Sequence, residues 1–451
     1  KEYRIKRRSV LATGRNLVRK LTDSLGSTTE VVYAPMGFKS VYTPVFDGPW
    51  LDSGRASPVF DIFPVPGTYL VQYLLTSAPT SAALGGTQDD KAMIRYAYHG
   101  LRVQTNGRGT LGYRRVATLD LQTGVEASTQ YLQAFPLSGR PHRTESRKLS
   151  TLPGDACMEQ GPDSSQCWFN LPVCGRPGGP ACPDESSPTG LLKRVTDTWA
   201  WRAPHNAQNL SLDSPDLGLG AAAIFVARTS SLELNYDLDG SFTHQVQNSS
   251  DSYDAFGNAL VASTATYSAV PTGPLELSSP DSIVTVESVY LNDATKWLLG
   301  RLSRSVVTHQ RDVEQIVRTT NFHYDSNTGL LIAEVIEPEG GESEYLATTY
   351  HHDSRGNRIR TTSCSLHVAQ RDWAACRNSV VTAMFREDPL HVHRTKRVEY
   401  DELGRYVRKE AGLFSTGPSP ADFVEGEVSS VLARNALGSP TAVANANGVV
   451  T

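Results

Sequence analysis

The chain has 451 residues, of which 36 are glycine, 26 are proline and 39% are hydrophobic. This composition is typical of a globular, loop-rich protein that is long enough for more than one domain. The 43 basic and 47 acidic side chains give a formal net charge of −4, which excludes the strong positive field of a protein that binds nucleic acid regardless of its sequence.

The two ends of the chain have a strand-like pattern. The first residues, KEYRIKRR, are basic, and we interpret them as a solvated edge strand rather than a nucleic-acid patch. The chain does not begin with Met and stops in the strand-like run NANGVVT, so we expect it to be a fragment of a longer protein. Its most apolar run, residues 217–227, is too short to cross a bilayer as a helix.

Alternating apolar residues predict half-buried antiparallel strands over residues 94–135. Tyr96 and Tyr98 share one face, and the apolar phase shifts by one residue after Gly100, which predicts a β-bulge there. The motif GRGTLG at 107–112 has the glycine spacing of a dinucleotide-binding loop. A strand-like segment follows it where such a loop needs a helix, so we interpret it as a turn.

Six cysteines form two local clusters. One consists of Cys157, Cys167, Cys174 and Cys182, and the other of Cys364 and Cys376. An even count in local clusters favours disulfides in an oxidising compartment, whereas zinc would require closely spaced ligand pairs. The first cluster has three possible connectivities. A bridge between Cys364 and Cys376 would stabilise the fold by roughly 3 kcal/mol in the chain-entropy model.

A short unit of Tyr-Asp, a nearby Gly and a following strand recurs along the second half of the chain. The copies are Tyr236, Asp237 and Gly240; Tyr253, Asp254 and Gly257; Tyr324, Asp325 and Gly329; Tyr350, Asp353 and Gly356; and Tyr400, Asp401 and Gly404. Tyr suits the end of a strand, Asp bonds the backbone two residues on, and Gly supplies positive φ. Weaker copies keep Asp23 with Gly26, or Gly438 alone. Each unit predicts one hairpin, and hairpins gain stability by stacking.

Several residue pairs look like ligand sites but lack part of what such sites need. Asp237 and Asp239 resemble the start of a calcium loop without its remaining oxygen ligands. His391 and His393 share one face of a strand, but a metal site needs a third ligand. No nucleophile elbow, P-loop or H-E-x-x-H motif is present. We therefore predict no metal, no cofactor and no catalytic residue in this chain.

Two further pairs have structural interpretations. His351 and His352 are expected on opposite faces of a strand, which makes a shared metal site less favourable still. Trp199 and Trp201 are interpreted as sheet packing rather than a sugar platform.

The Tyr-Asp-x-x-Gly units resemble YD repeats, also called Rhs repeats, whose hairpins wind into one spiral sheet that closes as a hollow shell. Residues 96–141 resemble the segment before the YD repeats in the B component of Tc insecticidal toxins and related virulence proteins. The landmarks are GRGTLGY, the acidic hairpin DLQTG, Tyr131, Gln133, Phe135, Pro136 and Gly139. The stretch LTDSLGSTTEVVYAP resembles what lies upstream in the same family. The Cys-rich stretch 150–190 departs from the family pattern.

These observations predict an all-β fold of antiparallel YD-repeat hairpins, coiled into part of a hollow shell, with a disulfide-rich loop insertion. We divide the chain into a β-rich segment at 1–145, a Cys/Pro/Gly-rich insertion at 146–190, and a YD-repeat sheet at 191–451 that continues beyond the C-terminus.

The resemblance implies containment of a toxic C-terminal segment until delivery. We predict a non-catalytic shell segment of a secreted or cell-surface Rhs/Tc-type toxin. Its partners would be its own C-terminal cargo and other toxin subunits, with no nucleic acid and no membrane insertion. One alternative is an extracellular YD-repeat recognition or adhesion module, which would bind on its outer face. A second is a glycan-acting enzyme within 142–230, which would need a carboxylate of perturbed pKa in a cleft.

Overall fold

The computed structural model confirms an all-β fold. It describes residues 17–24, 26–44, 59–65, 67–78, 91–104, 109–149, 190–202, 224–268, 279–341, 344–365, 372–378, 394–415, 423–435 and 438–451. Within these ranges the regular structure is β-strand except for one six-residue helix, α2 (Trp373–Asn378). The described strand pairs are antiparallel, apart from a two-residue parallel contact between β3 (Tyr42–Thr43) and β6 (Lys91–Gln104). The Cys-rich insertion predicted at 146–190 lies almost wholly outside the described residues.

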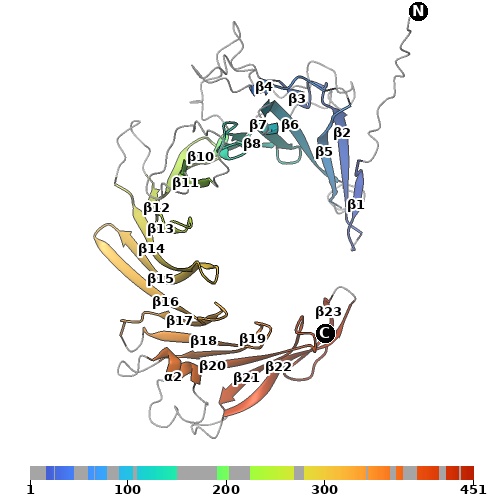
Figure 1. Ribbon diagram of the computed structural model, residues 1–451. Helices are drawn as coiled ribbons and strands as arrows, with labels where there is room; N and C mark the ends of the chain where they lie inside the picture. Colours follow the sequence, from blue (N-terminus) through green and yellow to red (C-terminus); the bar gives the residue numbers. More distant parts are fainter. Residues whose placement is uncertain are drawn as a thin grey trace, which may run out of the picture. The chain divides into compact units, whose positions relative to one another are not determined.

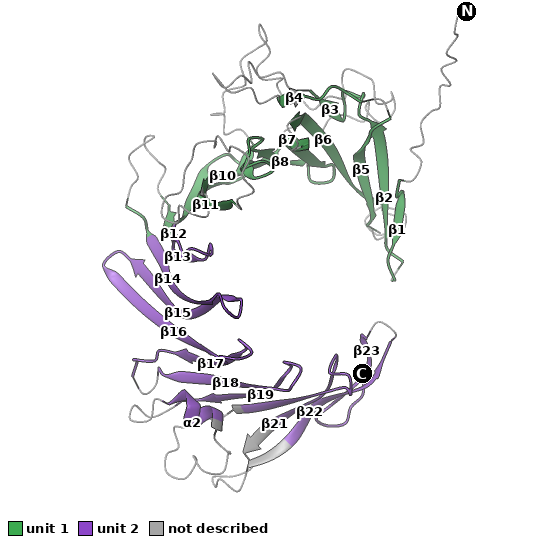
Figure 2. Ribbon diagram, in the orientation of Figure 1, with its two compact units in different colours: residues 1–251, 264–281 green, residues 252–263, 282–451 purple. Residues whose placement is uncertain are grey.

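The chain divides into two compact units (Figure 2). Unit 1 is Lys1–Asp251 with Thr264–Asp281, and unit 2 is Ser252–Ser263 with Ser282–Thr451. The boundary therefore runs through two strands, β12 (Phe242–Tyr253) and β13 (Ala259–Tyr267). The segment boundaries inferred from sequence at 145 and 190 rest on composition and stay a prediction.

Unit 1 is a sheet of mostly sequential hairpins (Figure 1). Its strands are β1 (Lys20–Thr22), β2 (Thr28–Pro35), β3 (Tyr42–Thr43), β4 (Val59–Asp61), β5 (Tyr69–Ser77), β6 (Lys91–Gln104), β7 (Gly109–Asp120), β8 (Val125–Tyr131), β9 (Pro141–Lys148), β10 (Leu191–Arg202), β11 (Phe225–Tyr236) and β12 (Phe242–Tyr253). Pairing runs β1–β2–β5–β6–β7–β8–β9–β10–β11–β12, and β3 and β4 also pair with β6.

Unit 2 repeats the same plan. Its strands are β13 (Ala259–Tyr267, shared with unit 1), β14 (Ser282–Asp293), β15 (Leu298–Arg311), β16 (Glu314–Tyr324), β17 (Leu331–Ile336), β18 (Leu346–His352), β19 (Arg358–Cys364), β20 (Arg394–Tyr400), β21 (Val407–Ser415), β22 (Phe423–Arg434) and β23 (Pro440–Asn445). From β14 to β23 every strand pairs antiparallel with the next strand in the chain. Sequential pairing of this kind needs only short connections.

The β-bulge predicted at Gly100 is displaced. Gly100 does have a positive φ of 60°. The register between β6 and β7 nevertheless stays constant through Arg102 and shifts between Arg102 and Val103. Gly100 adopts the backbone conformation that a bulge can use, but the pairing with β7 places the unpaired residue of the bulge further along the strands.

Each unit has a small core cluster among its described residues. In unit 1, Ala34, Met36, Val41 and Tyr42 are almost completely buried. In unit 2 the cluster lies under helix α2 and consists of Val335, Tyr345, Ala347, Cys364 and Cys376, with Trp373 packed against it.

Candidate functional site

Each repeat hairpin is closed by the aspartate that begins its turn. Between β18 and β19, the amide of Asp353 donates to the carbonyl of Asn357 (2.9 Å), and the amide of Gly356 donates to the carbonyl of Asp353 (3.1 Å). One carboxylate oxygen of Asp353 accepts the amides of Arg355 and Asn357, both at 2.8 Å. The turn thus satisfies its own backbone donors without a second layer of protein.

The same side-chain bond recurs in both units. The acceptor and the amide donor are Asp23 and Ser27, Asp254 and Asn258, Asp325 and Thr328, Asp401 and Arg405, Asn435 and Ser439, and Asn445 and Val449. The predicted turn glycines Gly240, Gly257, Gly329, Gly356 and Gly404 have φ values between 67° and 91°. The turn at Asn445 falls in the NANGVVT run that we expected to be strand-like; its signal is NANG, with Asn in the place of Asp.

The turn at Asp237 is a variation on this arrangement. Here Asp239 accepts the amide of Ser241 at 2.8 Å, so the second carboxylate of the calcium-like pair is engaged in its own turn. Tyr236 packs edge-on against Phe242, with ring centroids 5.8 Å apart. Tyr253, the tyrosine of the next copy, ends β12.

The tyrosines of the other copies contact the strand before their own. The hydroxyl of Tyr324 donates to the carbonyl of Leu302 in β15 at 2.9 Å. The hydroxyl of Tyr350 donates to the carboxylate of Glu334 in β17 at 3.2 Å, and its ring also lies under the guanidinium of Arg358 within its own hairpin. The hydroxyl of Tyr400 lies 3.5 Å from the carbonyl of Arg358 in β19. The tyrosines therefore tie one hairpin to the preceding one.

Successive turns also contact each other along one edge of unit 2, which we call the repeat edge. It consists of the connections β12–β13, β14–β15, β16–β17, β18–β19, β20–β21 and β22–β23 (Figure 1). In the β18–β19 turn, Asn357 donates its side-chain amide to the carbonyl of Gly404, which lies in the next turn of this edge, β20–β21, at 3.0 Å. Tyr406 lies so close to Gly438 that a Cβ there would meet the ring at 2.3 Å. Glycine is needed at these turns for close approach as well as for φ.

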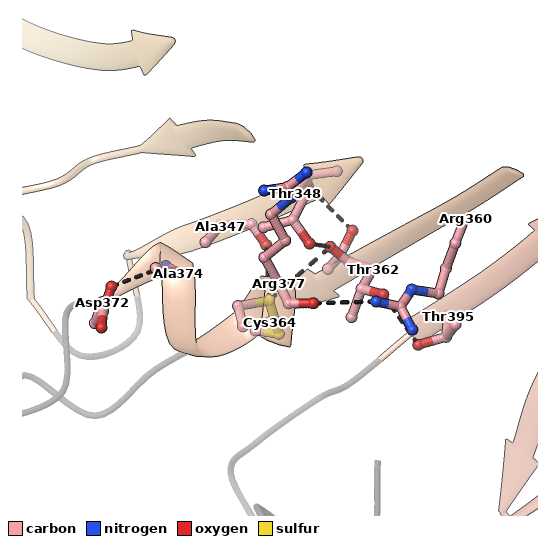
Figure 3. Close-up of a disulfide and its surroundings, with 12 residues drawn as sticks. Ala347, Thr348, Arg360, Thr362, Cys364, Asp372, Ala374, Arg377 and Thr395 are labelled. Carbon is pink, nitrogen blue, oxygen red and sulfur yellow. Dashed lines mark hydrogen bonds between the residues drawn. A yellow bond between two sulfur atoms is a disulfide. The ribbon is translucent and has the colours of Figure 1, made fainter. Parts of the chain in front are cut away.

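The predicted disulfide between Cys364 and Cys376 is confirmed (Figure 3). It joins the end of β19 to helix α2, and both cysteines are completely buried. Trp373 of the helix stacks on His323 of β16, with ring centroids 4.5 Å apart. The side chain of Asp372 accepts the amide of Ala374 at 2.8 Å and caps the helix. Cys157, Cys167, Cys174 and Cys182 lie outside the described residues.

The landmarks of residues 96–141 meet at one corner of unit 1. The side-chain amide of Gln133 donates to the carbonyls of Gly100 in β6 and Gly112 in β7, both at 2.7 Å. Ser138 donates to the carbonyl of Leu111 at 3.0 Å. Gly109 and Gly112 lie within strand β7, so this part of the motif is strand and the predicted turn is wrong there; Gly107 lies outside the described residues.

The carboxylate of Glu145 in β9 is surrounded by guanidinium groups. It accepts hydrogen bonds from Arg143 (2.6 and 2.8 Å), Arg194 (2.7 Å) and Arg147 (3.3 and 3.4 Å). Burial opposes ionisation, but these bonds and charges lower the pKa of Glu145 overall. An acid held ionised in this way is poorly suited to donate a proton, so it does not favour the glycan-acting alternative.

The other predicted candidates occupy structural positions. Trp199 donates its indole N–H to the carbonyl of Pro141 at 2.7 Å. His351 Nε2 lies 3.0 Å from the carbonyl of Arg377 in α2. His391 and His393 lie outside the described residues. Among the residues that the structure describes, no three His, Cys, Asp or Glu side chains form a group able to hold a metal ion.

The described part of the chain contains no helix with the length and hydropathy to span a membrane.

Solved structures of Tc toxin components match this chain at low sequence identity. The crystal structure of TcdB2-TccC3-Cdc42 matches with 10% identity and a TM-score of 0.45, over 95% of this chain and 23% of that one. The crystal structure of TcdB2-TccC3 matches with 10% identity and a TM-score of 0.39, over 94% and 31%. The Tc holotoxin pore of Photorhabdus luminescens matches with 13% identity and a TM-score of 0.23, over 94% and 24%.

This chain thus spans about a quarter of the length of the first of these proteins. No family model matches the sequence, and no curated protein matches it.

Proposed function

We propose that this chain is a non-catalytic wall segment of a secreted YD-repeat toxin, in which the sheet encloses a toxic C-terminal segment of the longer protein. The observation that carries the proposal is the repeat edge. Each hairpin caps its own turn, and successive hairpins contact each other through Tyr, Asn and Gly. A wall built in this way can extend by adding hairpins, because each hairpin satisfies the backbone hydrogen-bond donors of its own turn.

The disulfide supports the part of this proposal that places the protein in an oxidising compartment. A buried bridge between Cys364 and Cys376 forms and persists in an oxidising environment. We infer that the chain acts outside the cytoplasm. Mass spectrometry of unreduced peptides, from protein isolated in its native compartment, should show the bridge; free thiols at both positions would contradict this inference.

The decisive experiment uses the full-length protein, with all residues that follow 451. A density map should show the sheet of unit 2 bordering a closed lumen that contains density, and the segment after residue 451 should resist added protease until the protein is unfolded. An open or solid sheet, with the same segment cleaved at once in the folded protein, would contradict containment. That result would favour the recognition module.

A further inference from the structure

The hairpin formed by β15 and β16 is longer than the strand β17 beside it (Figure 1). β16 pairs with β15 from its first residue, Glu314, whereas its pairing with β17 on the other side begins only at Thr320. Among the residues that the structure describes, no strand pairs with Glu314–Arg318 on the β17 side. We call this segment the free edge, because it has a strand on one side only.

The backbone groups of the free edge point away from β15 at every second residue. Thr319, the residue after the edge, donates its amide to the carboxylate of Glu337 at 3.2 Å, and its carbonyl accepts the amide of Glu337 at 2.8 Å. Thr319 thus bonds on the β17 side. Because successive residues of a strand bond to opposite sides, Gln315 and Val317 present their N–H and C=O groups on that same side, where no described strand meets them.

The free edge also lacks the features that protect most sheet edges. Each of its residues is exposed, and the exposed fractions of Ile316 and Val317 are 56% and 47%. Its sequence, EQIVR, contains no proline, glycine or lysine, and no β-bulge interrupts its register with β15. Natural edge strands are blunted by such residues, and an apolar edge without them is suited to pair with a further strand.

The free edge is complementary to itself in an antiparallel pair. If two copies of the chain pair about Ile316, then Gln315 of each copy lies opposite Val317 of the other. Both of these residues present free backbone groups, and each such pair exchanges two hydrogen bonds. The same register places Glu314 of each copy opposite Arg318 of the other, and Ile316 opposite Ile316. Opposite charges and apolar residues are the cross-strand pairs that stabilise a sheet.

Other registers between two copies are less favourable. A shift by one residue opposes residues whose backbone groups point to opposite sides, so the hydrogen bonds are lost. A shift by two residues, in either direction, places Glu314 or Arg318 opposite the apolar Ile316. The charged residues have room for a partner in the second copy: Arg318 lies 3.7 Å from Glu337, but its side chain stays 55% exposed, and Glu314 is exposed as well.

We propose that the free edge joins two copies of this chain, with β16 of each copy paired antiparallel about a two-fold axis at Ile316. A two-fold interface uses the same patch on both copies, and it is the commonest symmetry of homo-oligomers. The contact is small, so the dimer is weak and depends on protein concentration. The repeat turns take no part in it, and the inference does not depend on containment.

Charge reversal tests the register, with sedimentation equilibrium of the 451-residue chain as the measurement. The unmodified chain should dimerise. Glu314→Arg and Arg318→Glu should each raise the Kd of the dimer roughly tenfold or more, because either change puts like charges opposite each other on both sides of the two-fold axis. An equimolar mixture of the two variants should dimerise again, since every charged contact in the mixed pair joins opposite charges.

The matched control is Arg304→Glu, which reverses an exposed charge of β15 outside the free edge and should dimerise like the unmodified chain. A variant that merely fails to fold is not rescued by mixing, so recovery in the mixture separates contact from folding. A monomeric chain, single variants that dimerise as tightly as the unmodified chain, or a mixture that does not recover would overturn the proposal. So would a full-length protein that stays monomeric while the 451-residue chain dimerises, because another segment of that protein would then cover the edge.

Discussion

The two edges of the unit 2 sheet join their strands in different ways. At the repeat edge, every described turn begins with Asp or Asn and is capped by that side chain. At the opposite edge, which we call the variable edge, the described connections differ from one another. They are the tight β15–β16 turn at Asp312, the β17–β18 connection that ends at Tyr345, and the β19–β20 connection that carries α2.

This difference shows where the fold allows new features. Turns at the repeat edge contact one another, so a longer insertion in one of them would displace its neighbours. At the variable edge, α2 sits on the sheet and is held by a disulfide and a stacked tryptophan, not by a repeated turn. Loops away from a repeated contact accept insertions more readily, which fits the position of α2.

The largest expected effect concerns the variable edge. Cys376→Ser removes the bridge that fixes α2 and leaves a buried thiol facing a buried hydroxyl. We expect the free energy of unfolding to fall by roughly 3 kcal/mol, measured by urea denaturation. Reduction of the unmodified chain should give a similar loss. If neither treatment changes the midpoint, the bridge does not stabilise α2 on the sheet.

The next effect separates the two reasons for glycine at the repeat edge. Gly438→Ala places a Cβ 2.3 Å from the ring of Tyr406, at a φ of 85°. Gly448→Ala has a φ of 74° and meets nothing within 4 Å. The backbone conformation should cost roughly 1 kcal/mol in both, and crowding against the ring of Tyr406 should cost Gly438→Ala a further ~1 kcal/mol. Equal urea midpoints for the two variants would show that contact between turns does not matter.

The carboxylate of a repeat turn gives a smaller, pH-dependent effect. Asp254 accepts the amides of Phe256 and Asn258 and the side chains of Asn258 and Asn292, at 2.8–2.9 Å. Asp254→Ala should lower the free energy of unfolding by about 1–2 kcal/mol at pH 7.

The sign of the pH dependence follows from the same bonds. Burial would raise the pKa of Asp254, but its hydrogen bonds lower it overall. Its contribution is therefore present above the unfolded value of about 3.9 and is lost as the pH falls through the lower folded value. The difference in the free energy of unfolding between the wild type and Asp254→Ala should therefore decrease below about pH 4. A gap that stays constant down to pH 2 would contradict this assignment.

The smallest effect concerns the tie between neighbouring hairpins. Tyr324→Phe removes one hydrogen bond, to the carbonyl of Leu302, and should cost about 1 kcal/mol. Tyr290→Phe, in β14 of the same unit, is the matched control because no hydrogen bond of its hydroxyl is seen among the described residues. Urea midpoints of the two variants measure the difference. A larger loss in Tyr290→Phe would show that the repeat tyrosine is not a tie.

The local features of the fold follow from the sequence alone. Tyr, Asp and Gly at fixed spacing specify a strand end, a capped turn and a positive φ, and these depend only on neighbouring residues. The even pair of cysteines near residue 370 predicted a bridge for the same reason, because its partners are close in the chain. Hairpins and the all-β class follow from such local rules.

Contacts between residues far apart in the chain depend on how the strands pair in the folded protein. Strand pairing places Arg360 opposite both His351 and Arg397, and the second of these pairs spans the connection that carries α2. Gln133 reaches two carbonyls on strands that precede it by more than twenty residues. The shift of the bulge away from Gly100 has the same cause. The register between two strands depends on the total energy of many weak contacts, and a local sequence pattern does not specify that total.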